Sequence, residues 1–139
     1  MITYALDTNI ISFMLKQNAG IINSYRKAND EGHIFVIPVI VYYEIRRGLL
    51  AVNAISQMEA FEDLCKMFDV VEMSFDGWEK AAQIWSTLRK SGNPLGRDDG
   101  DIFIAAQCIV GNYALVTDNI NDFSRIDGLQ YIAWAKSKN

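Results

Sequence analysis

Histidine, cysteine and proline are all scarce in this chain. Its 139 residues include one His, two Cys and two Pro. The single histidine, His33, argues against a Ser-His-Asp or Cys-His catalytic set, and its place at the start of an expected strand favours a structural role. Cys65 and Cys108 lie apart without C-x-x-C spacing, which indicates free, buried thiols in a reduced compartment.

Positive net charge and long apolar runs are missing as well. A net charge of −4 argues against a protein that coats nucleic acid by bulk electrostatics, although a local basic rim remains possible. The arginines and lysines available for such a rim are Arg46, Arg47, Arg89, Lys90 and Arg97. No stretch resembles a signal peptide or a membrane span, so we expect a cytoplasmic protein.

Short apolar runs alternate with amphipathic segments along the whole chain. The sequence predicts strands at residues 2–6, 33–37, 70–73, 113–117 and 131–134. It predicts helices at residues 10–16, 19–29, 39–50, 55–67, 75–90 and 102–110, and a helical turn at 119–123. With no repeat or linker, this pattern predicts one α/β domain over residues 1–139. Its sheet of four to five strands should be mostly parallel and covered on both faces.

Four carboxylates stand at or near the starts of expected helices, and they are the candidate functional residues: Asp7, Glu44, Asp101 and Asp118. Asp7 and Asp118 directly follow expected strands, and ligands of parallel sheets bind beyond the carboxyl ends of the strands. Carboxylate oxygens without His or Cys are ligands for Mg²⁺ or Mn²⁺. Such a site can activate water for hydrolysis of a phosphodiester.

Each acid also has an ordinary explanation. Asp7 could cap a helix, Asp98 and Asp101 have the spacing of a capping pair, and Asp118 could belong to a turn. Glu44 is harder to explain in this way, because it stands in a largely apolar helix where an unpaired charge is costly. Arg46 and Arg47 project to other sides of that helix, so a metal ion or a bound water is the better partner.

Four segments occur together in one order: residues 4–11 (YALDTNII), 43–48 (YEIRRG), 101–106 (DIFIAA) and 115–119 (LVTDN). In this set the chain resembles PIN-domain ribonucleases and, among them, the VapC toxins of bacterial toxin–antitoxin modules. The resemblance implies a three-layer α/β/α sandwich and a Mg²⁺- or Mn²⁺-dependent endoribonuclease. It makes Asp7 and Asp101 the principal metal ligands, with Glu44 completing the cluster and Asp118 in the fourth acidic position.

The resemblance also implies partners and supporting residues. Transfer RNA is the expected substrate, a small DNA-binding antitoxin should cover the site with its tail, and a homodimer is expected. Thr8 and Asn9 resemble residues that hold the first aspartate in place. Asp99 and Asp122 are further acids that could join the site.

Several apolar side chains could serve either the core or an interface. Phe13, Met14, Tyr42 and Leu49 could form a groove for the antitoxin tail, but core packing is the favoured interpretation. Trp78 and Trp85 are likewise expected in the core first and at an interface second.

Two other functions fit parts of the pattern. Asp7 could be the nucleophile of a phosphatase, but that chemistry wants a second acid at the position of Asn9 and a lysine near a later strand end. An inactive PIN-like module that only binds a partner's basic tail is the other alternative, and the full set of acids argues against it.

Overall fold

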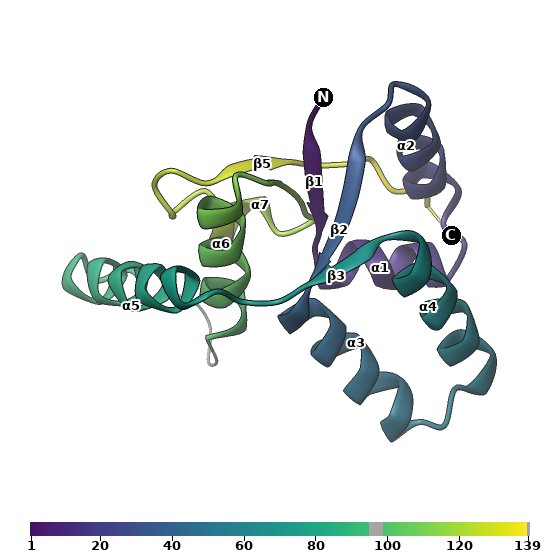
Figure 1. The fold of residues 1–139 in the computed structure, drawn as a ribbon, viewed down its shortest axis with the longest axis horizontal. Helices are drawn as coiled ribbons and strands as arrows, with labels where there is room; N and C mark the ends of the chain where they lie inside the picture. Colours follow the sequence, from purple (N-terminus) through teal and green to yellow (C-terminus); the bar gives the residue numbers. More distant parts are fainter. Residues whose placement is uncertain (95–98, 139) are drawn as a thin grey trace.

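Five parallel strands form the centre of the protein, in the order β3-β2-β1-β4-β5 (Figure 1). The computed structural model describes residues 1–94 and 99–138. The strands are β1 (Thr3–Leu6), β2 (Ile34–Pro38), β3 (Asp69–Val71), β4 (Ala114–Val116) and β5 (Gln130–Ile132). Ala5 of β1 pairs with Val36 on one side and Leu115 on the other. The expected sheet is confirmed, and all its described pairings are parallel.

Helices cover both faces of this sheet and complete the expected three-layer sandwich. In Figure 1 helices α1 to α4 gather on one side and α5 and α6 on the other. They are α1 (Thr8–Leu15), α2 (Ala19–Asp30), α3 (Val39–Ala51), α4 (Ile55–Met67), α5 (Phe75–Lys90), α6 (Gly100–Gly111) and the short α7 (Ile120–Phe123). No helix within residues 1–94 and 99–138 combines the length and apolar composition needed to cross a bilayer.

Central strands are buried on both faces, as the covering helices require. Tyr4, Ala5 and Leu6 of β1 are all buried, which explains why this strand is a continuous apolar run without alternation. Side-chain caps set where three helices begin: Asp7 accepts from the Thr8 amide, Asn18 from Ile21 and Ser74 from Gly77. The cap at Asp7 starts α1 two residues earlier than the expected residue 10.

The prediction that Trp78 and Trp85 lie in the core is wrong. Their exposed fractions are 45% and 43%. The buried stripe of α5 instead runs through small and aliphatic residues, Gly77, Ala81, Ile84 and Leu88. Trp78 directly follows Gly77 and Trp85 directly follows Ile84. Each tryptophan therefore lies about 100° further around the helix than a buried residue, at the margin of the buried stripe.

The prediction of core packing is confirmed for Met14 and Leu49, which are buried, and Phe13 is half-buried against the core. It is wrong for Tyr42, which is 37% exposed. Cys65 and Cys108 are both free thiols, as predicted, but only Cys108 is fully buried and Cys65 is half-buried. Nδ1 of His33 accepts a hydrogen bond of 3.1 Å from the Ile2 amide, which is a structural role.

Candidate active site

Glu44 and Asp118 lie near Asp7, at the point where the strand order of the sheet reverses. From β1 the chain runs outward through β2 and β3, then crosses to β4 on the other side of β1. In open α/β sheets such a reversal of strand order marks the crevice where ligands bind, and here it falls at the carboxyl ends of β1 and β4. Asp7 follows β1, and Thr117 and Asp118 follow β4. The Asp7 amide still donates to the Val116 carbonyl at 3.0 Å, so sheet pairing holds these residues side by side.

Asp7 is a nearly buried carboxylate with a donor on each oxygen. Only 3% of the residue is exposed. Oδ1 accepts from the Thr8 amide at 2.8 Å and Oδ2 accepts from the Thr117 hydroxyl at 2.6 Å. Burial raises the pKa of Asp7, the two hydrogen bonds lower it, and the nearby charges of Glu44 and Asp118 raise it further. Asp7 is therefore a carboxylate whose negative charge the surroundings only partly compensate.

Glu44 reaches the same site from α3. Its Oε1 accepts a hydrogen bond of 2.6 Å from the hydroxyl of Thr8, the residue whose amide holds Asp7. Thr8 thus positions two acids at once, one more than the sequence predicted. The neighbouring arginines point elsewhere, as expected: Arg46 pairs with Glu62 at 3.7 Å, and Arg47 lies over the Tyr43 ring.

Asp101 enters from the first turn of α6 and is linked to the loop after β4. Nδ2 of Asn119 lies 3.4 Å from Oδ2 of Asp101 and donates to Oδ2 of Asp122 at 3.0 Å. One amide group therefore links two acids that come from different elements. Asp122 consequently lies next to the site, while Asp99 is exposed at the start of α6.

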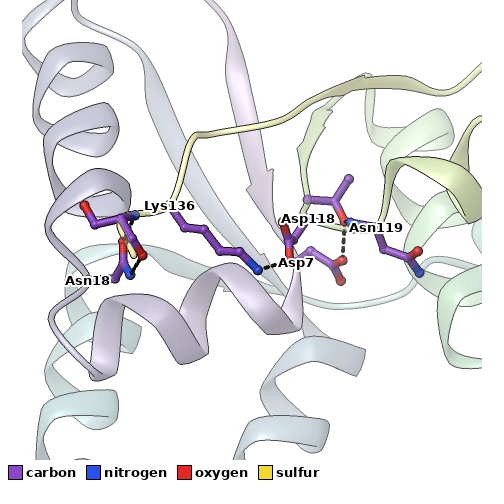
Figure 2. A network of polar contacts seen from close by, with 7 residues as sticks. Asp7, Asn18, Asp118, Asn119 and Lys136 are labelled. Atoms are coloured by element: carbon purple, nitrogen blue, oxygen red, sulfur yellow. Dashed lines mark hydrogen bonds and ion pairs between the residues drawn. The ribbon is translucent and has the colours of Figure 1, made fainter. Parts of the chain in front are cut away.

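Asp118 is paired with a lysine from the C-terminal part of the chain. Its Oδ2 lies 3.2 Å from Nζ of Lys136, and its side chain is 36% exposed. Figure 2 shows this lysine reaching across α1 toward Asp118 and Asp7. Arg97 and Asp98, which the sequence suggested as a phosphate contact and a cap, lie outside the described residues.

Sequence reasoning gave no role to Thr117 and Asn119, although both stand in the 115–119 segment. Thr117 is fully buried, and its hydroxyl accepts from the Asn119 amide at 2.9 Å while it donates to Asp7. The signal in the sequence was that two polar residues, Thr117 and Asn119, flank Asp118 directly after a buried strand. That pattern predicts a turn equally well.

The donor chemistry of the site suits a hard divalent ion. Its ligands would be carboxylate oxygens, supported by hydroxyl and amide groups, and such a set favours Mg²⁺ or Mn²⁺ over zinc. Across the part of the chain that the structure describes, no three acidic, His or Cys side chains already form a metal-binding group. Mg²⁺ is usually held by one or two carboxylates and water, so it does not need a cluster of three protein ligands.

Comparison with known proteins gives this architecture a family. Residues 4–129 match the PIN domain. Ribonuclease VapC1 of Haemophilus influenzae is 31% identical over 137 residues, which cover 96% of this chain and 98% of the relative. Ribonuclease VapC2 of Rickettsia felis is 25% identical over 134 residues, with the same coverage.

Solved structures agree with the sequence relatives. VapBC2 from Rickettsia felis, bound to a DNA fragment from its promoter, matches with a TM-score of 0.87 at 23% identity over 96% of this chain and 100% of that chain. VapBC-1 from nontypeable Haemophilus influenzae matches with a TM-score of 0.83 at 29% identity over 96% and 98%. The chain belongs to the PIN-domain family and, within it, to the VapC proteins. The resemblance in the sequence is confirmed.

Proposed function

We propose that this protein is a divalent-metal-dependent endoribonuclease and the toxin of a VapBC-type toxin–antitoxin module. The observation that carries the proposal is the buried Asp7 at the crevice of the sheet, with Glu44 and Asp118 close enough to raise its pKa. Its relative VapC1 is named a ribonuclease and shares this chain's length. We place the activity in the cytoplasm, where RNA and reduced thiols such as Cys108 coexist.

The mechanism assigns a task to each acid. Asp7 and Asp101 would hold Mg²⁺ or Mn²⁺, and Asp118, the fourth acid, adds negative charge at the edge of the site. An ion held there would supply Lewis acidity toward water and the phosphate. Glu44 orients the attacking water and accepts its proton, while the Thr8 hydroxyl keeps the carboxylate in one orientation.

Transfer RNA is our proposed substrate. A compact site at a sheet edge can accept a splayed single-stranded loop more easily than a stacked duplex, and such loops are what proteins read in structured RNA. Arg46 and Arg47 lie on α3, the helix of Glu44, but point away from the acids, so we propose that they contact phosphates further along the RNA.

An antitoxin tail has a groove available beside the acids. A cavity of about 270 Å³ runs between α1 and α3, and residues of both helices line it, among them Thr8, Glu44, Gly48 and Leu49. The related VapBC proteins were solved as complexes, one of them on promoter DNA. We propose that a small DNA-binding antitoxin places an apolar segment in this groove and a basic side chain on the carboxylates.

A homodimer is the oligomeric state we propose. Phe75, Trp78 and Trp85 of α5 are all exposed, and aromatic side chains are enriched at protein interfaces. Light scattering should give the mass of two chains for the purified protein. A double Trp78→Ala and Trp85→Ala variant should shift the mass toward one chain, and an unchanged dimer mass would place the interface elsewhere.

Incubation of the purified protein with total RNA tests the activity. We expect cleavage with Mg²⁺ or Mn²⁺, none with EDTA, and none for Asp7→Ala in metal-containing buffer. Glu59→Gln, which removes an exposed acid of α4 far along the chain from the site, is the control and should cleave normally. Cleavage by Asp7→Ala would refute the assignment. Antitoxin binding without any metal-dependent cleavage would instead favour the inactive binding module.

A further inference from the structure

The last described residues cross the molecule and are anchored on both sides of Lys136. After β5, the C-terminal segment (residues 133–138) runs back over the sheet and ends beside α2 (Figure 1). Trp134 is buried, with its ring 6.3 Å from Tyr4 and 6.2 Å from Phe35. Ser137, three residues after Trp134, is clamped by Asn18. The Asn18 side chain accepts a hydrogen bond from the Ser137 amide at 2.9 Å and donates one to its carbonyl at 3.1 Å.

The start of α2 is shaped for this close approach. A Cβ atom on Gly20 would lie 2.4 Å from the Ala135 carbonyl oxygen and 2.8 Å from the Ser137 amide nitrogen. Any other residue would push the C-terminal segment away. Asn18 is itself buried, so both halves of the clamp are fixed within the fold. The backbone of Lys136 therefore has a defined position relative to the acidic site.

The Lys136 side chain leads from this anchored segment to the acids. Its ammonium lies 5.0 Å from the centre of the Phe13 ring and 3.2 Å from Oδ2 of Asp118 (Figure 2). The side chain is 51% exposed, so another anion can reach it. An exposed ion pair of this kind adds little to stability, which leaves its place at the site unexplained by folding alone.

Lys136 also belongs to a basic depression next to the acids. A cavity of about 570 Å³ is lined by Phe13, Lys16, Asn18, Lys136, Ser137 and Lys138. Three of these six residues are lysines, in a protein whose net charge is −4. The depression and the acidic site share Lys136, which lines the first and contacts Asp118 in the second.

We propose that this depression binds the RNA backbone and that Lys136 holds the phosphate next to the one being cleaved. The inference rests on the proposed function and names the surface that this function needs. An acidic protein that brings a polyanion to four carboxylates requires a local cationic path, and lysines at the rim provide one. Asp118 and Phe13 keep the ammonium in place until a phosphate oxygen takes it over.

Kinetics of Lys136→Gln test the proposal on bulk transfer RNA. We expect kcat/KM to fall about tenfold, mainly through KM, because a contact made in both the bound and transition states is lost. The slope of log kcat/KM against log salt concentration should become shallower by about 0.7 for the one phosphate contact removed. Lys136→Arg should restore most of the activity. Lys66→Gln, on an exposed site of α4, should match the wild type in both measurements.

The remaining lysines and the clamp extend the test. Lys16→Gln and Lys138→Gln, each tested alone, should also make the slope of log kcat/KM against log salt concentration shallower. A merely structural role of these lysines would leave that slope unchanged. Asn18→Ala should lower activity in the same direction, and adding Lys136→Gln to it should cost less than tenfold because both act on one contact. A Lys136→Gln variant with wild-type activity and salt slope would overturn the proposal. A faster variant would also overturn it, since Lys136 would then be inhibitory.

Binding separates this inference from the proposed function. Affinity for end-labelled transfer RNA is measured by fluorescence anisotropy in EDTA, where no cleavage is expected. Lys136→Gln should weaken binding about tenfold and Lys66→Gln should not. If the wild type binds in this way but never cleaves RNA, the proposed activity fails and the binding surface stands. Equal binding by Lys136→Gln and the wild type refutes the surface, whatever the cleavage assay shows.

Discussion

The hydroxyl of Thr117, just after β4, donates a 2.6 Å hydrogen bond to Oδ2 of Asp7, just after β1. The same hydroxyl accepts the Asn119 amide at 2.9 Å, which directs its proton toward Asp7. This bond joins the ends of the two strands between which the crevice opens. It also lowers the pKa of a carboxyl group that burial would otherwise raise further.

Replacing Thr117 with Val should therefore make Asp7 harder to ionise and lower the free energy of unfolding. Valine keeps the shape but leaves Oδ2 of Asp7 and the Asn119 amide without a partner, at a cost of about 1–3 kcal/mol in the free energy of unfolding. The pKa of Asp7 should rise, so RNA cleavage should need a higher pH as well as more metal. Thr117→Ser keeps the hydroxyl and serves as the control. A Val variant with an unshifted pH–rate profile would contradict the role given to Thr117.

Asp7→Asn should stabilise the protein at neutral pH in EDTA while abolishing cleavage. Because the folded-state pKa is raised above the ordinary 3.8, the folded protein binds the Asp7 proton more tightly than the unfolded chain does. Stability contributed by Asp7 is therefore present below pH 3.8 and lost as pH rises through the folded-state pKa. The gain in Tm of Asp7→Asn over the wild type should shrink as the pH is lowered through the folded-state pKa of Asp7 toward 3.8. Asp63→Asn, an exposed acid of α4, should show no such gain.

Metal should reverse this order of stability. Mg²⁺ or Mn²⁺ that binds only the folded state at a hundred times its Kd adds about 2.7 kcal/mol to the free energy of unfolding. The Tm of the wild type should rise when metal is added and fall back to its original value when EDTA is added. Asp7→Asn and Asp101→Asn should respond much less. Equal shifts in all three proteins would show that the ion binds somewhere other than this site.

Asn119→Ala should separate the two acids that its amide links. Without Nδ2, Asp101 and Asp122 lose the donor that they share, so the repulsion between the two carboxylates is less compensated than in the wild type. We expect cleavage to fall about tenfold, as for loss of one charge-assisted hydrogen bond, with partial recovery at high metal concentration. Asn121→Ala, on an exposed neighbour in α7, is the matched control. Equal activity of the two variants would remove Asn119 from the site.

Gly48 allows the groove to be tested with two substitutions at one position. A Cβ atom there meets nothing within 4 Å, and the residue lies in helix α3. Gly48→Ala should stabilise the helix by about 0.5–1 kcal/mol and leave antitoxin binding intact. Gly48→Phe should fill the groove of about 270 Å³ and weaken antitoxin binding, measured by titration calorimetry. Tight binding to the Phe variant would place the antitoxin elsewhere.

Much of the architecture follows from local sequence. Short apolar runs such as residues 2–6 favour buried strands over helices because of their length, and the helical segments between them favour parallel pairing. Two strands end earlier than the sequence predicts, β3 at Val71 and β5 at Ile132, and the residues Met73 and Trp134 beyond them pack with the core. The tryptophans of α5 were misplaced because a helical period does not say how wide the buried stripe is.

The sequence by itself determined which acids exist and that two of them follow strands of a parallel sheet. Only the tertiary structure decided their partners, since hydrogen bonds between residues far apart in the chain depend on how the elements pack. Thr8 reaches Glu44 because α1 and α3 are neighbours, and Thr117 reaches Asp7 because β4 pairs with β1. Lys136 arrives beside Asp118 because the C-terminal segment recrosses the sheet, a path that no local pattern of residues encodes.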